Sequence, residues 1–169
     1  GMETGFFRFA NHERLAKTGQ VYTTALSSLG VSSMIFIIIG CLLSPEITRW
    51  LEYADNPAYI WTMVVAVGVD AYTSLPFAYL RYKKRPIRFA TLKLLNIAVN
   101  IGLNLFFILL CPVIWRTSPE WIAWFYRPDF GIGYIFLANM ISSLVVLMLV
   151  IPEIFAETYS FSGKLLREM

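Results

Sequence analysis

Apolar residues fall in four long blocks along the chain, separated by shorter polar or aromatic stretches. The blocks cover residues 21–43, 58–80, 89–112 and 132–152. At about 1.5 Å of rise per residue, each block is long enough as an α-helix to cross a hydrocarbon core of about 30 Å. The pattern therefore predicts an all-α integral membrane protein with four transmembrane helices.

Prolines stand near the ends of these blocks. Ser44-Pro45 is expected to end the first span, Pro112 to close the third and Pro152 to close the fourth, because proline cannot donate a helical hydrogen bond. Pro76 lies inside the second span, where a kink is expected. The segments outside the spans are then residues 1–20, 44–57, 81–88, 113–131 and 153–169.

Basic residues are unevenly distributed among these segments. Of the 14 Lys and Arg residues, eleven lie in segments 1–20, 81–88 and 153–169 or, as Lys93, just inside the third span. Because Lys and Arg concentrate in short cytoplasmic loops, both ends of the chain are predicted to be cytoplasmic, in a bacterial inner membrane. The predicted periplasmic loops are residues 44–57 and the Trp-rich segment 113–131.

Composition supports this location and argues against other classes of protein. Hydrophobic residues make up 57% of the chain and charged residues 15%, against about 25% charged in soluble domains. The net charge of +3 is too small to favour nucleic acid as a partner. Cys41 and Cys111 lie alone in apolar runs, which predicts packing and neither a disulfide nor a metal site. No Ser or Cys nucleophile and no acid partner can be placed beside His12 to form a catalytic arrangement. No catalytic or phosphate-loop motif occurs either, so neither an enzyme nor a cofactor is predicted.

Polar side chains recur at helical spacing inside the third span. Asn96, Asn100 and Asn104 are four residues apart and Lys93 precedes them by three, so all four lie on one helical face. One interpretation is that the amides join neighbouring helices, at about 0.6 to 2 kcal/mol each. The other is that they line an aqueous cavity and bind a hydroxyl-rich sugar, with Lys93 attracting phosphate.

Asp70 lies near the middle of the second span. A charge at that depth costs about 2.5 to 3.5 kcal/mol, so the carboxyl group is expected to be protonated or paired. Three roles are open: an acceptor between helices, a proton- or cation-coupling group, or a group exposed to water near a cavity. The basic run 81–88 is expected to set the topology and to anchor anionic headgroups, with pyrophosphate recruitment as a secondary role.

Three stretches resemble a known family: residues 1–10 (GMETGFFRFA), 87–96 (IRFATLKLLN) and 128–134 (PDFGIGY). Together they are similar to polysaccharide-biosynthesis flippases of the multidrug, oligosaccharidyl-lipid and polysaccharide exporter superfamily, in a form typical of Bacteroidetes. These motifs are strings of aromatic and small residues with a few polar landmarks, spread over essentially the whole chain.

The resemblance implies that the chain is part of the N-terminal bundle of an exporter of about 12 to 14 helices, and that its spans correspond to the third to sixth. Such proteins move undecaprenyl-pyrophosphate-linked oligosaccharide across the inner membrane by alternating access. In the turn Glu-x-Gly-x-x-x-Phe that begins at Glu3, that acid resembles one implicated in gating in lipid II flippases. Arg8 stands in the same turn, at a position that differs between branches.

The expected function is therefore flipping of lipid-linked oligosaccharide for polysaccharide or lipopolysaccharide biosynthesis, together with the remaining helices of the transporter. The candidate cavity residues are Lys93, Asn96, Asn100 and Asn104, assigned from periodicity, and the candidate coupling or gating residues are Asp70, Glu3 and Arg8. Two alternatives stay open: a cation-coupled multidrug exporter of the same superfamily, and a membrane scaffold subunit that transports nothing.

Overall fold

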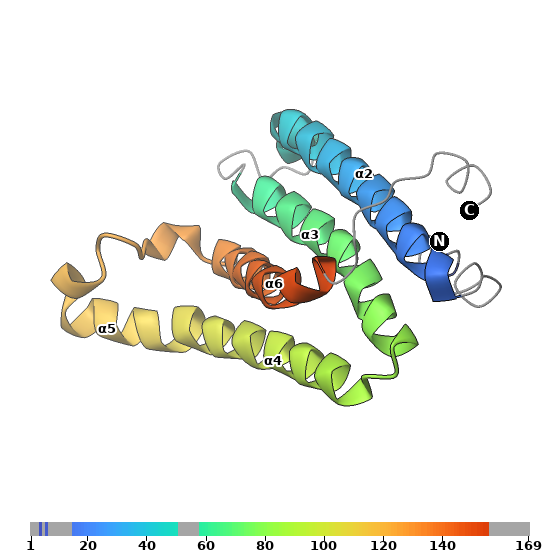
Figure 1. The fold of residues 1–169 in the computed structure, drawn as a ribbon. Coiled ribbons are helices and arrows are strands. Elements are labelled where there is room, and N and C mark those ends of the chain that lie inside the picture. Colours follow the sequence, from blue (N-terminus) through green and yellow to red (C-terminus); the bar gives the residue numbers. More distant parts are fainter. Residues whose placement is uncertain (1–3, 5, 7–14, 51–57, 156–169) are drawn as a thin grey trace.

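The computed structural model describes residues 4, 6, 15–50 and 58–155 of the 169-residue chain. This part of the chain consists of helices and the turns that join them, without a strand (Figure 1). It contains four helical segments long and apolar enough to cross a membrane, which confirms the predicted all-α membrane class. Their main helices are α2 (Leu15–Trp50), α3 (Ala58–Tyr82), α4 (Pro86–Leu105) and α6 (Gly133–Ile154).

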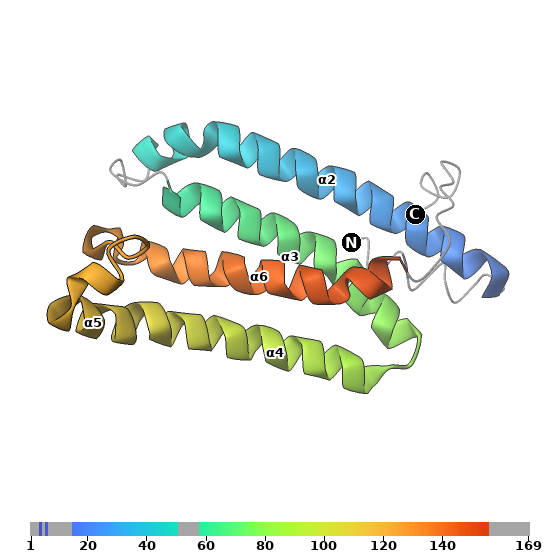
Figure 2. The same cartoon turned by 60° about the vertical axis from the view of Figure 1, so that its left-hand side comes forward.

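The helices do not pack in the order in which they follow one another along the chain. Helix α3 packs against α2 on one side and α6 on the other, and α6 in turn packs against α4. Figure 2 shows the resulting order α2, α3, α6, α4. Helices α3 and α4 meet mainly near the turn that joins them, and α6 fills the space that opens between them.

Helix α2 continues past the proline at which the sequence predicts an end. Pro45 has no N–H to donate to the carbonyl of Cys41, four residues earlier. The hydroxyl of Ser44 donates to that carbonyl instead, over 2.8 Å. The helix therefore continues to Trp50, and the predicted boundary lies inside it.

The third span passes Pro112 by way of a widened turn. Helix α4 is followed without a break by the π-helix η1 (Phe106–Leu110) and by α5 (Cys111–Thr117). The N–H of Cys111 donates to the carbonyl of Phe106, five residues earlier, which is the π pattern. A wider turn accommodates a proline ring that would clash with the carbonyl four residues back in a regular α-helix. The span therefore ends at Thr117 and not at Pro112.

Helices α2 and α3 approach each other closely at glycines. A Cβ atom added to Gly40 would lie 2.5 Å from Val64 Cγ1, and one added to Gly68 would lie 2.4 Å from Ile37 Cγ1. Between helices in lipid, close packing replaces the hydrophobic effect as a driving force, and small residues at the contact permit it. The α2–α3 pair is thus held by backbone proximity along the membrane-spanning part of both helices.

The two ends of the bundle differ in chemistry. The aromatic end, residues 115–134, contains the 3-10 turns η2 (Pro119–Trp121) and η3 (Pro128–Phe130). There the Tyr134 ring stacks on Tyr126 with centroids 5.0 Å apart. Trp121 and Trp124 are 79% and 84% exposed, as expected where aromatic side chains meet lipid headgroups. The basic end, at the α3–α4 turn and the end of α6, carries the run 81–88.

Candidate functional site

The asparagine stripe of the third span lies along the contact between α4 and α6. Asn100 Nδ2 donates to Asn139 Oδ1 over 2.9 Å, and Asn104 Nδ2 donates to Asn100 Oδ1 over 2.7 Å. One turn nearer the basic end, the Ser142 hydroxyl donates to the side-chain and backbone oxygens of Asn96, the latter over 2.8 Å. The stripe thus joins the two helices through two separate groups of hydrogen-bonded side chains.

Two residues in these hydrogen-bonded groups, Asn139 and Ser142, were not predicted as site residues. They are three residues apart and therefore lie on one face of α6, a spacing that sequence reasoning could have detected. Their partners could not be named from sequence, because nothing in the order of the spans places α6 beside α4. The three asparagines of α4 are half-buried, so each also has an edge that α6 does not cover.

Asp70 lies on a different surface of the bundle. Its side chain is exposed on α3, and no side chain of the described residues forms a hydrogen bond or an ion pair with its carboxylate. Large apolar side chains dominate the other outward faces of the spans, with Leu42 and Leu94 exposed by 74% and 66%. A mid-span carboxylate is therefore presented on a surface that would otherwise face lipid.

Helical spacing extends this surface toward the basic end. Ser74 and Arg81 follow Asp70 at four and eleven residues, so they lie on the same face of α3, and Phe77 between them is buried. The Lys93 ammonium of α4 lies 4.7 Å from the centre of the Phe77 ring. We call Asp70, Ser74, Arg81 and Lys93 the polar face.

Aromatic contacts hold the two cations of the polar face in place. The guanidinium carbon of Arg81 lies 5.3 Å from the centre of the Phe89 ring. Phe89 packs edge to face on Phe77, the ring beneath Lys93, with centroids 5.7 Å apart. Cation–π contacts of this kind contribute about 0.5 to 2 kcal/mol and are stronger where water is excluded. The structure thus brings two of the predicted site residues, Asp70 and Lys93, to one side of the α3–α4 pair, while the asparagines face α6.

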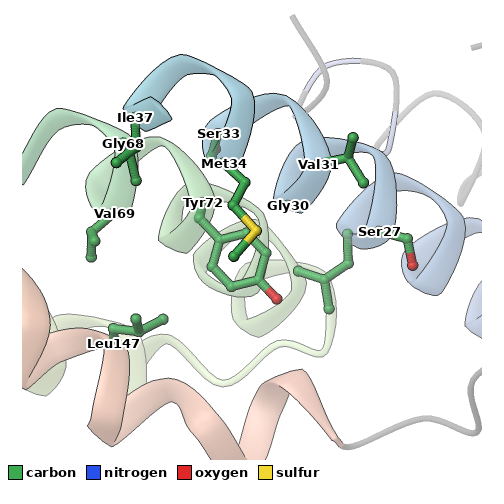
Figure 3. Close-up of a pocket in the computed structure, with 11 residues that line it drawn as sticks. Ser27, Gly30, Val31, Ser33, Met34, Ile37, Gly68, Val69, Tyr72 and Leu147 are labelled. Atoms are coloured by element: carbon green, nitrogen blue, oxygen red, sulfur yellow. The ribbon is translucent and has the colours of Figure 1, made fainter. Parts of the chain in front are cut away.

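An apolar cavity of about 440 Å³ opens between α2 and α3 within the membrane-spanning part of the bundle. Figure 3 shows the Tyr72 ring of α3 lying between Met34 of α2 and Leu147 of α6. Gly30 leaves room for that ring, because a Cβ there would lie 3.1 Å from Tyr72 Cε2. The volume falls in the range of small-molecule sites, and the lining suits an apolar ligand rather than a sugar.

The remaining candidate residues lie outside the sites described above or outside the described part of the chain. Glu3 and Arg8 are not among the described residues, so their gating role stays a prediction. Cys41 and Cys111 are free thiols on α2 and α5. Within the described ranges, no three His, Cys, Asp or Glu side chains lie close enough together to hold a metal ion.

Comparison with known proteins leaves the family open. No family model, curated protein or solved structure matches this chain. The resemblance to polysaccharide flippases therefore stays a prediction that depends on the three sequence stretches alone.

Proposed function

We propose that this chain is part of a transporter that flips undecaprenyl-pyrophosphate-linked oligosaccharide across a bacterial inner membrane. The observation that supports this most is Asp70, a carboxylate in the middle of a span that faces outward from the bundle. A charge facing lipid at the bilayer centre costs about 2.5 to 3.5 kcal/mol, whereas one facing a water-filled path or further protein costs far less. Charged groups inside membranes most often mark such paths.

The chemistry of the polar face suits a phosphorylated substrate. Arg81 and Lys93 bring two positive charges to a surface that also carries the Ser74 hydroxyl. Cationic groups attract phosphate, and hydroxyl groups exchange hydrogen bonds with sugars. Asp70 stands two turns away from the Phe77 ring under Lys93, where it can take up the coupling role expected for an intramembrane acid. In this proposal the asparagine stripe keeps α4 on α6.

The test is a charge-neutralising exchange in the full-length protein in its own membrane. Asp70→Asn should strongly reduce display of the glycan at the cell surface while protein abundance is unchanged. Glu120→Gln, which removes an exposed acid at the aromatic end, is the matched control and should leave display intact. Undiminished display in Asp70→Asn would contradict a role for the polar face in transport.

A second candidate, export of apolar drugs, is favoured by the cavity between α2 and α3. Its volume of about 440 Å³ and its Met34 and Tyr72 lining suit a drug-sized apolar molecule. Deletion of the gene separates the two candidates, because glycan export predicts a loss of surface glycan and drug export predicts increased drug accumulation. Filling the cavity by Gly30→Leu should impair drug export and leave glycan display nearly unchanged.

A further inference from the structure

A polar cavity of about 290 Å³ lies at the basic end, where α3 ends, α4 begins and α6 ends. It is separate from the polar face and from the apolar cavity between α2 and α3. Lys83, Arg85 and Arg88 line one part of its wall, and Glu153 of α6 lines another. These residues flank the ends of membrane-spanning helices, so the cavity lies at the depth of lipid headgroups.

Glu153 is fixed in this wall, but one of its two carboxylate oxygens has no hydrogen-bond partner in the described structure. Its side chain is only 6% exposed, and its Oε1 forms an ion pair with Arg88, with an Nε–Oε1 distance of 2.7 Å. Its backbone carbonyl accepts a hydrogen bond from the Tyr22 hydroxyl over 2.9 Å, which fixes the end of α6 against α2. Its second carboxylate oxygen, Oε2, has no hydrogen-bond partner in the described structure. A buried acceptor without a donor is costly, so a ligand group that donated a hydrogen bond to Oε2 would stabilise this wall.

The same cavity favours negative charge. Lys83 and Arg85 contribute two cationic side chains, and Arg88, which pairs with Glu153 through its Nε, contributes a third. The Lys83 ammonium lies 5.3 Å from the centre of the Tyr79 ring, which limits its freedom at the cavity wall. A ligand that suits all of these groups carries an anionic phosphate for the cations and a hydroxyl that donates to Glu153.

We propose that this cavity binds the headgroup of a lipid in which a phosphate ester is joined to a hydroxyl-bearing group. A glycerophospholipid such as phosphatidylglycerol has this chemistry, and so does a polyprenyl-pyrophosphate-linked sugar. With the first source, the inference is independent of the proposed function. With the second, it rests on the proposed function and makes the cavity a cytoplasmic docking point for the transported lipid.

The test measures lipids retained by the purified chain, using native mass spectrometry in a mixture of phosphatidylglycerol and phosphatidylmethanol. Both lipids carry one phosphodiester charge, and only the first has hydroxyl groups to donate. We expect about tenfold preferential retention of phosphatidylglycerol, the effect of one hydrogen bond to a charged acceptor. Glu153→Gln places an amide on the wall and should abolish the preference. Equal retention of the two lipids by the unaltered chain would overturn the role of Glu153.

A second pair of variants tests the cations. Arg85→Gln removes a charge from the cavity wall, whereas Lys84→Gln removes one from the same turn at a position that does not line the cavity. We expect Arg85→Gln to lower retention of both lipids about tenfold and Lys84→Gln to change it little. Equal effects would reduce the cavity to a general basic surface and overturn the proposal. Far-ultraviolet circular dichroism verifies that each variant is folded.

Competition identifies the source of the headgroup. A polyprenyl-pyrophosphate-linked sugar that displaces phosphatidylglycerol at equal concentration would assign the cavity to the transported lipid, and failure to displace it would assign the cavity to the glycerophospholipid. Retention of neither lipid would overturn the site itself. A transport defect in Asp70→Asn is measured separately, so failure of this site and failure of the proposed function are distinguishable.

Discussion

The hydrogen bond between Asn100 and Asn139 should show energetic coupling between α4 and α6. Asn100 donates to Asn139 Oδ1 over 2.9 Å and accepts from Asn104 Nδ2 over 2.7 Å. Asn100→Leu keeps a similar side-chain volume and removes both bonds. Hydrogen bonds between membrane helices contribute about 0.6 kcal/mol on average and about 1.7 kcal/mol at most. The variant should therefore lose about 1 to 3 kcal/mol of unfolding free energy.

A double-mutant cycle isolates the bond between the helices. Asn139→Leu alone should lose about 0.6 to 1.7 kcal/mol, and the Asn100→Leu/Asn139→Leu chain should lose less than the sum of the two single variants, because both remove the same bond. Unfolding is measured by titration with sodium dodecyl sulfate in mixed micelles and followed by circular dichroism. Thr117→Val is the control, since its hydroxyl donates only to Val113 of its own helix, and it should change stability by less than about 0.5 kcal/mol.

This reasoning would be refuted if the stability losses of the two single variants simply added up in the double variant. A coupling energy below about 0.3 kcal/mol would mean that the two amides are not partners. The placement of Asn100 would then have to be explained by a surface other than α6, and the contact between α4 and α6 would lose one of its polar pairs.

Other predictions follow from the packing and charges of the bundle. Gly68→Ala forces a Cβ to within 2.4 Å of a side chain of α2 and should lower the free energy of unfolding by about 1 to 3 kcal/mol. Gly102→Ala, which has open space around it, should not destabilise the chain. Unfolding in detergent tests both. Arg88→Gln leaves the buried carboxylate of Glu153 without its cation. The free energy of unfolding should fall by about 1 to 3 kcal/mol, allowing for the 45% exposure of the arginine. Adding Glu153→Gln should restore part of this loss. Burial raises the pKa of Tyr126 above its ordinary value, so the unfolded state ionises first and stability should fall as the pH rises above about 10; Tyr126→Phe should lose less stability over that range.

The four spans could be predicted because length and apolar content alone decide whether a helix can cross a bilayer. Whether a helix ends at a proline could not be predicted. Pro45 was expected to end a helix, but the hydroxyl of Ser44 satisfies the carbonyl that proline leaves without a donor. Pro112 was expected to do the same, and a π turn accommodates it. Pro152 lies inside α6, which ends at Ile154.

The candidate residues were only partly predictable for a related reason. Helical periodicity places Asn96, Asn100 and Asn104 on one face, but it cannot say which neighbour that face meets. That neighbour is α6, the last of the four membrane-spanning segments among the described residues, and it lies between two helices that are adjacent in sequence. The pair between Arg88 and Glu153 joins residues 65 positions apart in the same way, so it depends on packing that no local pattern encodes.

The central claim is that the face of α3 carrying Asp70 lines an aqueous path, and labelling of cysteines tests it most directly. In the full-length protein, with Cys41 and Cys111 replaced by alanine, Ser74→Cys and Leu94→Cys are treated in native membranes with a water-soluble thiol reagent. The account predicts that Ser74→Cys reacts and that Leu94→Cys, on a lipid-facing surface, does not. Protection of both cysteines would contradict an aqueous path along α3 and would favour a membrane scaffold.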